Sequence, residues 1–478
     1  MKKQIKLMAV LSAAGILTAA APQLGFFNTA STVYAKATGW VEENGTWRFY
    51  EEGDYFATDS WKKYGEDWYY LNEDGEIAIS QEIDEYYVDE SGKRVTNFWV
   101  SVTNDSYWDS PDSPEEYWHY YGKDGKAVVS KWQKINNSWY YFDEQGQMLT
   151  GKVEIAGSTY YLGGENDGAQ KTGWFELDSA EEDSEHPRAW YYFDKDGIMV
   201  KDQVDKKISG SYYTFVNGEM QTGWYKLPVT ATPSEAAENT DNNTSAAGYQ
   251  YYDESGARAD GWKEIEGIEG ISAEGEQHWF FFKNGAPYFA KKGIQLFTVN
   301  SQKYGFNTKG EMQTGLEVIT LEDGNTANFY FAESGAINTG KQSIYDEDLG
   351  ENQIWYFATS GSKKGQGFHG ILDDTLYEYG LRKEADADLR VAPFALNGKN
   401  YLVNTNGVLQ KASSTSKSTA KPELGSGFRD FKDTNEKVYV VDVNGLFLSI
   451  LYSCKDTSNV GLSFGSGTKG CRVRKQCL

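Results

Sequence analysis

The chain has 478 residues and a net charge of −24 at pH 7, with 70 acidic residues against 46 lysines and arginines. A surface of this sign repels phosphate backbones and anionic headgroups, which argues against nucleic acids and anionic membranes as partners. A cationic or neutral ligand is compatible with it. Aromatic residues make up 15% of the chain, and 50 glycines accompany only 9 prolines. This composition is typical of short strands joined by tight turns rather than of helices.

The first 35 residues are organised like a secretory signal peptide. Three lysines within the first six residues precede an apolar stretch at about 7–21, and residues 33–35 offer a small-x-small cleavage site. The apolar stretch is too short and wrongly flanked to cross a membrane. We therefore expect residues 1–35 to direct secretion, and we predict no transmembrane segment.

From residue 39 onward, one aromatic unit recurs. In its clearest copy, Trp132 opens a short strand, the string Trp-Tyr-Tyr-Phe at 139–142 forms a second strand, and an acidic turn ends at Gly146. An isolated hairpin of this size is marginal in water and needs neighbours to bury its rings. Further copies of the aromatic strand lead to Gly75, Gly92, Gly125, Gly168, Gly197, Gly218, Gly256, Gly285, Gly310, Gly335 and Gly361, with degenerate copies ending at Gly407 and Gly445.

Self-similarity at roughly 20–30 residues indicates a repeat architecture in which each unit contacts mainly its neighbours. We therefore predict an all-β fold, a repeat solenoid of tandem β-hairpins. Long polar insertions at 102–116, 176–189 and 228–248 each separate a leading tryptophan from the following aromatic strand. Repeat proteins place such insertions on one face, often the binding face.

The recurring motifs resemble those of the cell-wall-binding repeat family of Gram-positive bacteria, which includes choline-binding and glucan-binding repeats. The motifs are Gly-Trp (39–40, 173–174, 223–224, 261–262), Trp-Tyr-Tyr-Phe (139–142, 190–193) and Met-x-Thr-Gly (148–151, 220–223, 312–315). The resemblance covers about residues 39–410. It implies a β-hairpin solenoid wound as a left-handed superhelix, and it leaves the ligand open.

The family's ligand sites lie between consecutive repeats, lined by two tryptophans of one repeat and an aromatic residue of the next. The resemblance implies four such sets here: Trp61, Trp68 and Tyr87; Trp132, Trp139 and Tyr161; Trp174, Trp190 and Tyr213; Trp262, Trp279 and Tyr304. Three rings can surround a quaternary ammonium by cation–π attraction, and the same rings could stack on a sugar. The alternative is that these tryptophans only fill the space between hairpins.

The domain boundaries follow from the repeats. We assign a signal peptide to 1–35, tandem repeats to 36–410, a flexible linker to 411–424 from its composition, a degenerate terminal repeat to 425–445, and an atypical basic tail to 446–478. All three cysteines lie in the tail, so no disulfide staples the repeats. A shifted reading frame after Gly445 is one explanation of the tail, and a genuine basic anchor is the other.

No catalytic or metal-binding motif stands out. The four histidines lack two-His metal spacing, and none accompanies a nucleophile turn. The string at 194–197, Asp-Lys-Asp-Gly, lacks the further ligand positions of a calcium loop and is predicted to be a hairpin turn. We therefore predict a protein that is not an enzyme, with no cofactor and no metal.

The favoured function is multivalent binding of a wall polymer by a secreted, wall-associated protein. Choline-bearing teichoic acid and glucan-type carbohydrate are the two leading ligands. One alternative is a structural spacer or adhesin that presents its loops to a host surface ligand. A further alternative is the wall-binding remainder of a hydrolase.

Overall fold

The computed structural model describes residues 38–452 except 53, 105–113, 180–186 and 229–244. Within these ranges the regular structure is β, apart from one short 3-10 helix, η1 (Pro422–Leu424). The predicted all-β fold of tandem hairpins is therefore confirmed. The predicted signal peptide and the centres of the three predicted insertions lie outside the described residues.

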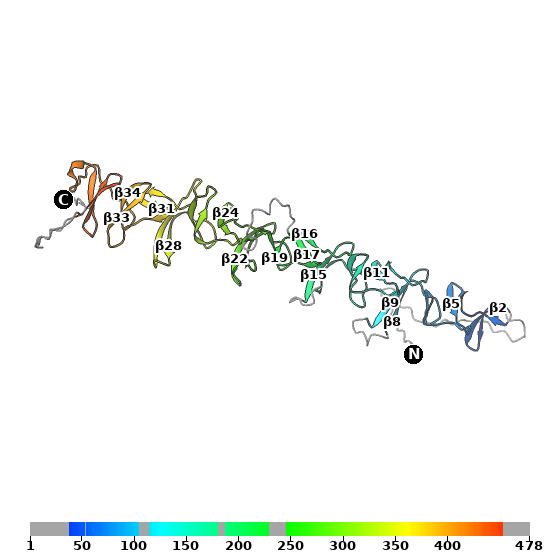
Figure 1. Ribbon diagram of the computed structural model, residues 1–478. Coiled ribbons are helices and arrows are strands. Elements are labelled where there is room, and N and C mark those ends of the chain that lie inside the picture. The colour runs from blue at the N-terminus through cyan, green and yellow to red at the C-terminus, as the bar shows by residue number, and fades with distance from the viewer. Residues whose placement is uncertain (1–37, 53, 105–113, 180–186, 229–244, 453–478) are drawn as a thin grey trace, which may run out of the picture. The chain divides into compact units, whose positions relative to one another are not determined.

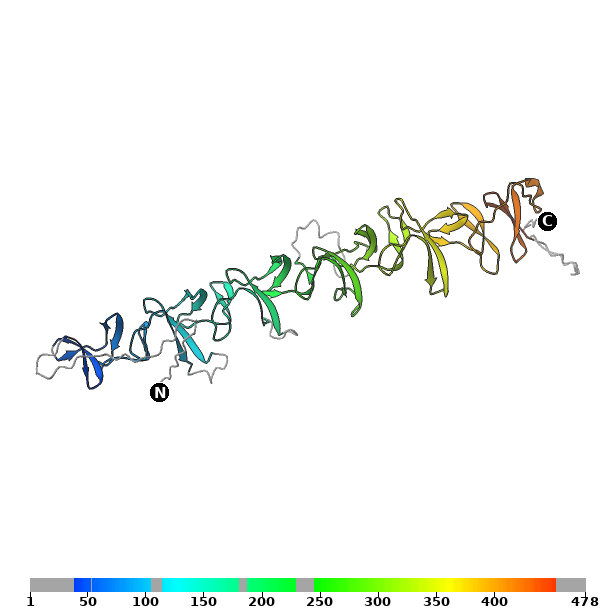
Figure 2. The same ribbon diagram turned by 180° about the vertical axis from the view of Figure 1, so that it is seen from behind.

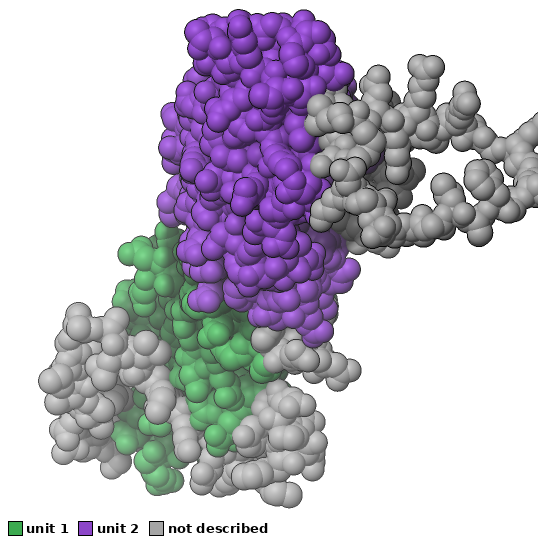
Figure 3. Space-filling model, turned by 90° about the vertical axis from the view of Figure 1, so that its left-hand side faces the viewer, with its two compact units in different colours: residues 1–206, 214–220 green, residues 207–213, 221–478 purple. Residues whose placement is uncertain are grey.

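Two compact units divide the chain by their internal contacts: residues 1–206 with 214–220, and residues 207–213 with 221–478 (Figure 3). The strands up to residue 220 are β1 (Gly39–Glu43), β2 (Thr46–Glu52), β3 (Tyr55–Phe56), β4 (Ser60–Tyr64), β5 (Asp67–Leu71), β6 (Gln81–Ile83), β7 (Tyr86–Val88), β8 (Phe98–Thr103), β9 (Glu116–Tyr121), β10 (Lys131–Ile135), β11 (Ser138–Phe142), β12 (Lys152–Ile155), β13 (Ser158–Tyr161), β14 (Gly173–Asp178), β15 (Arg188–Phe193), β16 (Gln203–Ile208), β17 (Ser211–Val216) and β18 (Glu219–Met220). The later strands are β19 (Gly223–Lys226), β20 (Tyr249–Tyr252), β21 (Gly261–Glu266), β22 (Gln277–Lys283), β23 (Ala286–Pro287), β24 (Ile294–Val299), β25 (Gln302–Asn307), β26 (Gly315–Thr320), β27 (Thr326–Phe331), β28 (Gly340–Asp346), β29 (Glu351–Phe357), β30 (Gly370–Leu372), β31 (Thr375–Glu378), β32 (Leu381–Arg382), β33 (Val391–Leu396), β34 (Lys399–Asn404), β35 (Phe428–Lys432), β36 (Lys437–Asp442) and β37 (Phe447–Tyr452).

Consecutive strands pair as antiparallel hairpins, which Figure 1 and Figure 2 show as short pairs of arrows in chain order. In β10/β11 the register runs from Lys131 opposite Phe142 to Ile135 opposite Ser138. The two turn residues, Asn136 and Asn137, both have positive φ (48° and 72°). This is the turn geometry whose twist matches that of two-stranded hairpins, and asparagine tolerates it.

An acidic or amide side chain organises the turn after many of the aromatic strands. The Asp143 carboxylate accepts N–H groups of Gln145 and Gln147, while the Gly146 N–H donates to the Asp143 carbonyl. Asp194 is bonded in the same way by Asp196 and Ile198, so the predicted turns at 143–146 and 194–197 are confirmed. The same arrangement occurs at Asn72, Asp89, Asp253, Asn307, Asn404, Asp433 and Asp442.

The segment after each turn links its own hairpin to the preceding one. The Met148 N–H donates to the Trp118 carbonyl of the preceding hairpin, and the next N–H, of Leu149, donates to Tyr141 of its own hairpin. Equivalent donors to the preceding hairpin are Arg94, Ala127, Gln170, Met199, Arg258, Met312 and Ile337. Each hairpin is thereby held to its neighbour, the arrangement expected of a repeat protein.

The core is a series of small clusters rather than one large centre. One cluster joins β7 to β8 and β9, and the next joins β9 to β10 and β11; their buried members are Tyr87, Val95, Val100 and Tyr121 in the first, and Tyr120, Val128, Ile135 and Phe142 in the second. Burial therefore depends on adjacent hairpins.

The structure corrects the predicted linker and the last repeat boundary. The segment 411–424 is anchored at particular residues: Ser418 is only 3% exposed, and its hydroxyl donates to the Asp430 carboxylate, which also accepts the Thr419 N–H. Small polar residues that look like a linker by composition here satisfy a carboxylate of β35. Strand β37 pairs with β36, so the terminal hairpin continues past Gly445. Residues 453–478, with all three cysteines, lie outside the described residues.

Close contact at the turn glycines should make them essential for stacking. Gly92 has φ +78°, and an added Cβ would lie 2.2 Å from Cγ2 of Ile77, which belongs to the preceding hairpin. We expect Gly92→Ala to lower the free energy of unfolding by about 2–4 kcal/mol, because a clash with a stiff side chain adds to the backbone strain. Gly157 has φ +79° with nothing within 4 Å of an added Cβ, so Gly157→Ala should cost only about 1 kcal/mol. Equal losses in chemical denaturation of the two variants would show that the contact with Ile77 does not matter.

Candidate ligand-binding sites

The leading tryptophan of a hairpin lies between two other aromatic rings. Trp132 of β10 contacts Tyr141 of its own hairpin at 5.3 Å between ring centroids and Tyr160 of the next hairpin at 4.9 Å. Both contacts are edge-to-face, the arrangement that aromatic quadrupoles favour. The same three-ring cluster recurs as Trp61 with Tyr70 and Tyr86, and as Trp262 with Phe281 and Tyr304.

A second tryptophan lies on the same face, one pleat further along the aromatic strand. Trp139, Trp190 and Trp279 occupy this outer position and are 44%, 44% and 41% exposed. The Trp279 ring lies 6.4 Å from that of Trp262 at 73°. A large apolar ring left open at an equivalent place in three hairpins marks a surface suited to a ligand.

The outer tryptophans differ in the charge of the residue directly across the hairpin. Lys63 and Lys134 lie opposite Trp68 and Trp139, whereas Glu176 and Glu264 lie opposite Trp190 and Trp279; these four cross-strand pairs follow from the hairpin registers. The Lys134 ammonium is 6.0 Å from the centre of the Trp139 ring, within the range of a cation–π contact. Among the described residues Glu264 makes no ion pair, while Glu176 is 3.7 Å from the Arg188 guanidinium.

The junction of Trp61 and Trp68 already holds a cation of the chain itself. The Arg94 guanidinium carbon lies 5.6 Å from the centre of the Trp68 ring and 4.9 Å from that of Tyr86. Its Nε is buried and has no hydrogen-bond partner. The rings therefore provide the main surroundings of this charge.

Two of the four predicted third rings are corrected by one residue. The structure places Tyr86, not Tyr87, against Trp61, and Tyr160, not Tyr161, against Trp132. Side chains alternate along a strand, so Tyr87 and Tyr161 face the other way; their partners are Tyr121 for Tyr87, and Phe175 and Phe193 for Tyr161.

The other two predicted third rings lie on β25 and β17. Tyr304 of β25 contacts Trp262 at 4.8 Å between ring centroids. Tyr213 is half-buried in β17, the strand whose Phe215 stacks on Trp174 at 5.8 Å.

Sequence reasoning missed two aromatic clusters that span insertions. Trp99 contacts Tyr120 of its own hairpin and Tyr140 of the next, both at 5.1 Å. Trp224 contacts Tyr251 and Phe280 in the same manner. Each leading tryptophan is separated from its partner strand by one of the long insertions. Treating each insertion as a long hairpin loop, and pairing the residues before it with those after it, would have found both clusters.

Three tyrosines of these clusters are held in the neutral form. Burial raises the pKa of the Tyr70, Tyr140 and Tyr251 hydroxyls above their usual range. No three His, Cys, Asp or Glu side chains gather to hold a metal ion within the described parts of the chain. The clusters therefore offer π-faces and nearby carboxylates or ammonium groups, which suit binding.

Comparison with known families matches three stretches of the chain. The family described as choline-binding repeat matches residues 128–175, and the putative cell wall binding repeat matches residues 59–77 and 189–199. The first of these stretches includes Trp132 and Trp139. Within the described residues, no helix has the length and apolar character that a membrane crossing requires.

Among curated relatives, the chain is 24% identical to Glucosyltransferase-I of Streptococcus downei over 386 residues. The match takes in 78% of this chain but only 19% of that relative. Among solved structures, it is similar to the modular autolysin LytC of Streptococcus pneumoniae (20% identity, TM-score 0.36, 66% of this chain and 56% of that one). It is also similar to the choline-binding domain of CbpL from the same organism (23% identity, TM-score 0.26, 39% and 98%).

The matched stretches include the leading and outer tryptophans Trp61, Trp68, Trp132 and Trp139. These stretches of the chain are therefore repeats of the choline-binding and putative cell wall binding type.

Proposed function

We propose that this chain is a secreted, non-catalytic surface protein that holds wall polymers through several aromatic sites at once. The observation that carries the proposal is the repeated exposure of an outer tryptophan, Trp139, Trp190 or Trp279, beside a half-buried cluster of aromatic rings. Each such site is weak by itself. Sites arrayed along one chain strengthen binding to a polymer because the second contact becomes intramolecular.

The junction of Trp262 and Trp279 is best suited to a trimethylammonium group, and choline-bearing teichoic acid is the ligand we favour. Its rings offer negative π-faces, and Glu264 adds a carboxylate across the strand from Trp279. Both attract a cation that cannot donate hydrogen bonds. Similarity of residues 128–175 to choline-binding repeats supports choline as a ligand of the chain, and that stretch holds Trp132 and Trp139 rather than this junction.

A glucan-type carbohydrate is the second candidate, favoured at the junction of Trp132 and Trp139. The Lys134 ammonium near the Trp139 ring repels a cationic ligand, but it can donate hydrogen bonds to sugar hydroxyls beside a stacking surface. Similarity to a glucosyltransferase over most of this chain supports this candidate. One protein can therefore use its junctions for different parts of a polymer.

Replacing the outer tryptophan should separate binding from packing. We expect Trp279→Ala to weaken choline binding at its site by about 5- to 30-fold, the loss of a cation–π contact of about 1–2 kcal/mol. Glu264→Gln should weaken it less, because the rings remain. The matched control is Tyr345→Ala, which removes a ring that is 60% exposed on β28. Isothermal titration with choline measures all three variants.

The spacer alternative gives a different result. If Trp279→Ala only lowers the melting temperature, and neither choline nor a glucan column retains the protein, then the tryptophans are core residues. Retention by glucan with no response to choline would remove the trimethylammonium proposal and leave the carbohydrate one.

Removing the internal cation should open one more site. Arg94→Gln frees the face of Trp68, so we expect the number of choline sites in titration to rise by one. The Lys126 ammonium still lies 5.8 Å from the centre of the Tyr86 ring in this variant. The control is Arg258→Gln, because Arg258 covers Tyr212 at a distance of 4.2 Å in a hairpin that has no tryptophan. An unchanged stoichiometry for Arg94→Gln, with the fold intact by circular dichroism, contradicts the cage at this junction.

A further inference from the structure

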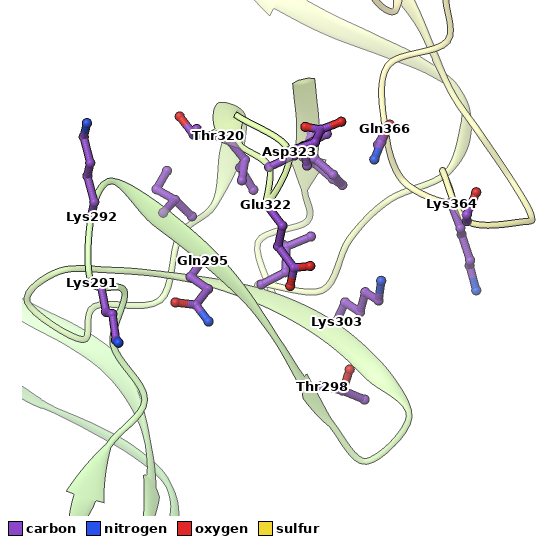
Figure 4. Close-up of a pocket in the computed structure, with 16 residues that line it drawn as sticks. Lys291, Lys292, Gln295, Thr298, Lys303, Thr320, Glu322, Asp323, Lys364 and Gln366 are labelled. Atoms are coloured by element: carbon purple, nitrogen blue, oxygen red, sulfur yellow. The ribbon is translucent and has the colours of Figure 1, made fainter. Parts of the chain in front are cut away.

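A groove with a volume of about 830 Å³ lies between the hairpins β24/β25 and β26/β27, with residues 362–366 on a third side (Figure 4). Its floor is aliphatic, formed by Ile294, Leu296 and Leu321 above the buried Ile319 and Phe329. All of these residues belong to the same compact unit.

This junction differs from the aromatic ones. Leu296 lies opposite Gly305 in the hairpin register, just as Trp132 lies opposite Tyr141. A leucine and a glycine therefore replace an indole and a phenol. The Phe331 ring packs against Gly305, where an added Cβ would lie 2.7 Å from its Cζ, while Leu296 lines the groove.

Four lysines line the groove: Lys291, Lys292, Lys303 and Lys364. None of them forms an ion pair within the described part of the chain, and two acids, Glu322 and Asp323, share the lining. The lining is thus net positive in a chain whose net charge is −24. Unpaired cations concentrated in one hollow of an acidic protein create a local field that attracts anions.

The lysines are spread along the groove instead of converging on one point. In Figure 4, Lys291 and Lys292 lie at one end, Lys303 lies between, and Lys364 lies at the other end. This spacing suits a ligand with repeated negative charges more than a single small anion. The aliphatic floor can pack on the carbon face of a sugar or polyol, and Gln295, Thr298 and Gln366 can bond its hydroxyls.

We propose that this groove binds a stretch of anionic wall glycopolymer, a chain of sugars or polyols joined by phosphodiesters or carrying carboxylates. The site is separate from the aromatic junctions and does not depend on choline. Its lysines are exposed, so each contact is weak and salt-sensitive.

The test compares two triple variants of the full protein that lower the net charge equally. The groove variant is Lys291→Ser/Lys303→Ser/Lys364→Ser, and the control is Lys283→Ser/Lys341→Ser/Lys399→Ser. The control lysines are exposed, lie outside the groove and form no ion pair among the described residues. For each variant, binding is measured first to a synthetic poly(glycerol phosphate) and then to a polygalacturonate oligomer, in low salt with excess free choline.

We expect the groove variant to bind about tenfold more weakly than the control, since three exposed ion pairs of about 0.5 kcal/mol each are lost. If the groove variant loses affinity for poly(glycerol phosphate) alone, the ligand is a phosphodiester chain. If it loses affinity for both probes, the groove recognises the negative charge that they share. Equal binding by the two variants overturns the proposal. Because free choline is present throughout, failure of the aromatic sites does not affect the result.

Discussion

A two-stranded hairpin cannot bury its own leading ring, and the rest of the structure depends on this constraint. Trp132 is covered on one side by Tyr141 of its own hairpin and on the other by Tyr160 of the next. The backbone hydrogen bond from the Met148 N–H to the Trp118 carbonyl joins the hairpin that carries Trp132 to the hairpin before it. In the proposed function, folding and ligand binding use the same rings, and a binding surface forms where the packing leaves an outer ring uncovered.

Local patterns made most of the fold predictable. The alternating string at 139–142 and the acidic turn before Gly146 depend only on residues close in sequence, so both were predicted correctly. The third ring was harder, because a tyrosine pair presents one ring to each face. Which of the two rings meets the tryptophan depends on the buried residue that follows the pair. Val88 is buried after Tyr86 and Tyr87, and Tyr86 shares its face of the strand. Contacts across insertions, as at Trp99, involve strands that a long polar segment separates, so the spacing of the repeats alone does not reveal their pairing.

Composition misled where a polar residue had a structural role. The serines and threonines near 418 satisfy the Asp430 carboxylate, which no linker propensity anticipates. The net charge of −24 has a similar origin in part, because turn carboxylates such as Asp143 and Asp194 each bind two backbone N–H groups. The charge of the whole chain is therefore a poor guide to any one site, and the sign at each junction is decided by one or two nearby residues.

Irregularity among the repeats underlies our proposal that one scaffold recognises different chemical groups. A uniform repeat would place the same site at every junction. Here the residue opposite the outer ring changes from Lys134 to Glu264, and the leading ring itself is replaced by Leu296. A polymer that carries quaternary ammonium groups on a phosphodiester backbone presents both signs of charge along one chain. Weak sites of both kinds, held by rigid neighbouring hairpins, would select such a polymer over one of a single sign, because a polymer of one sign can use only part of the array.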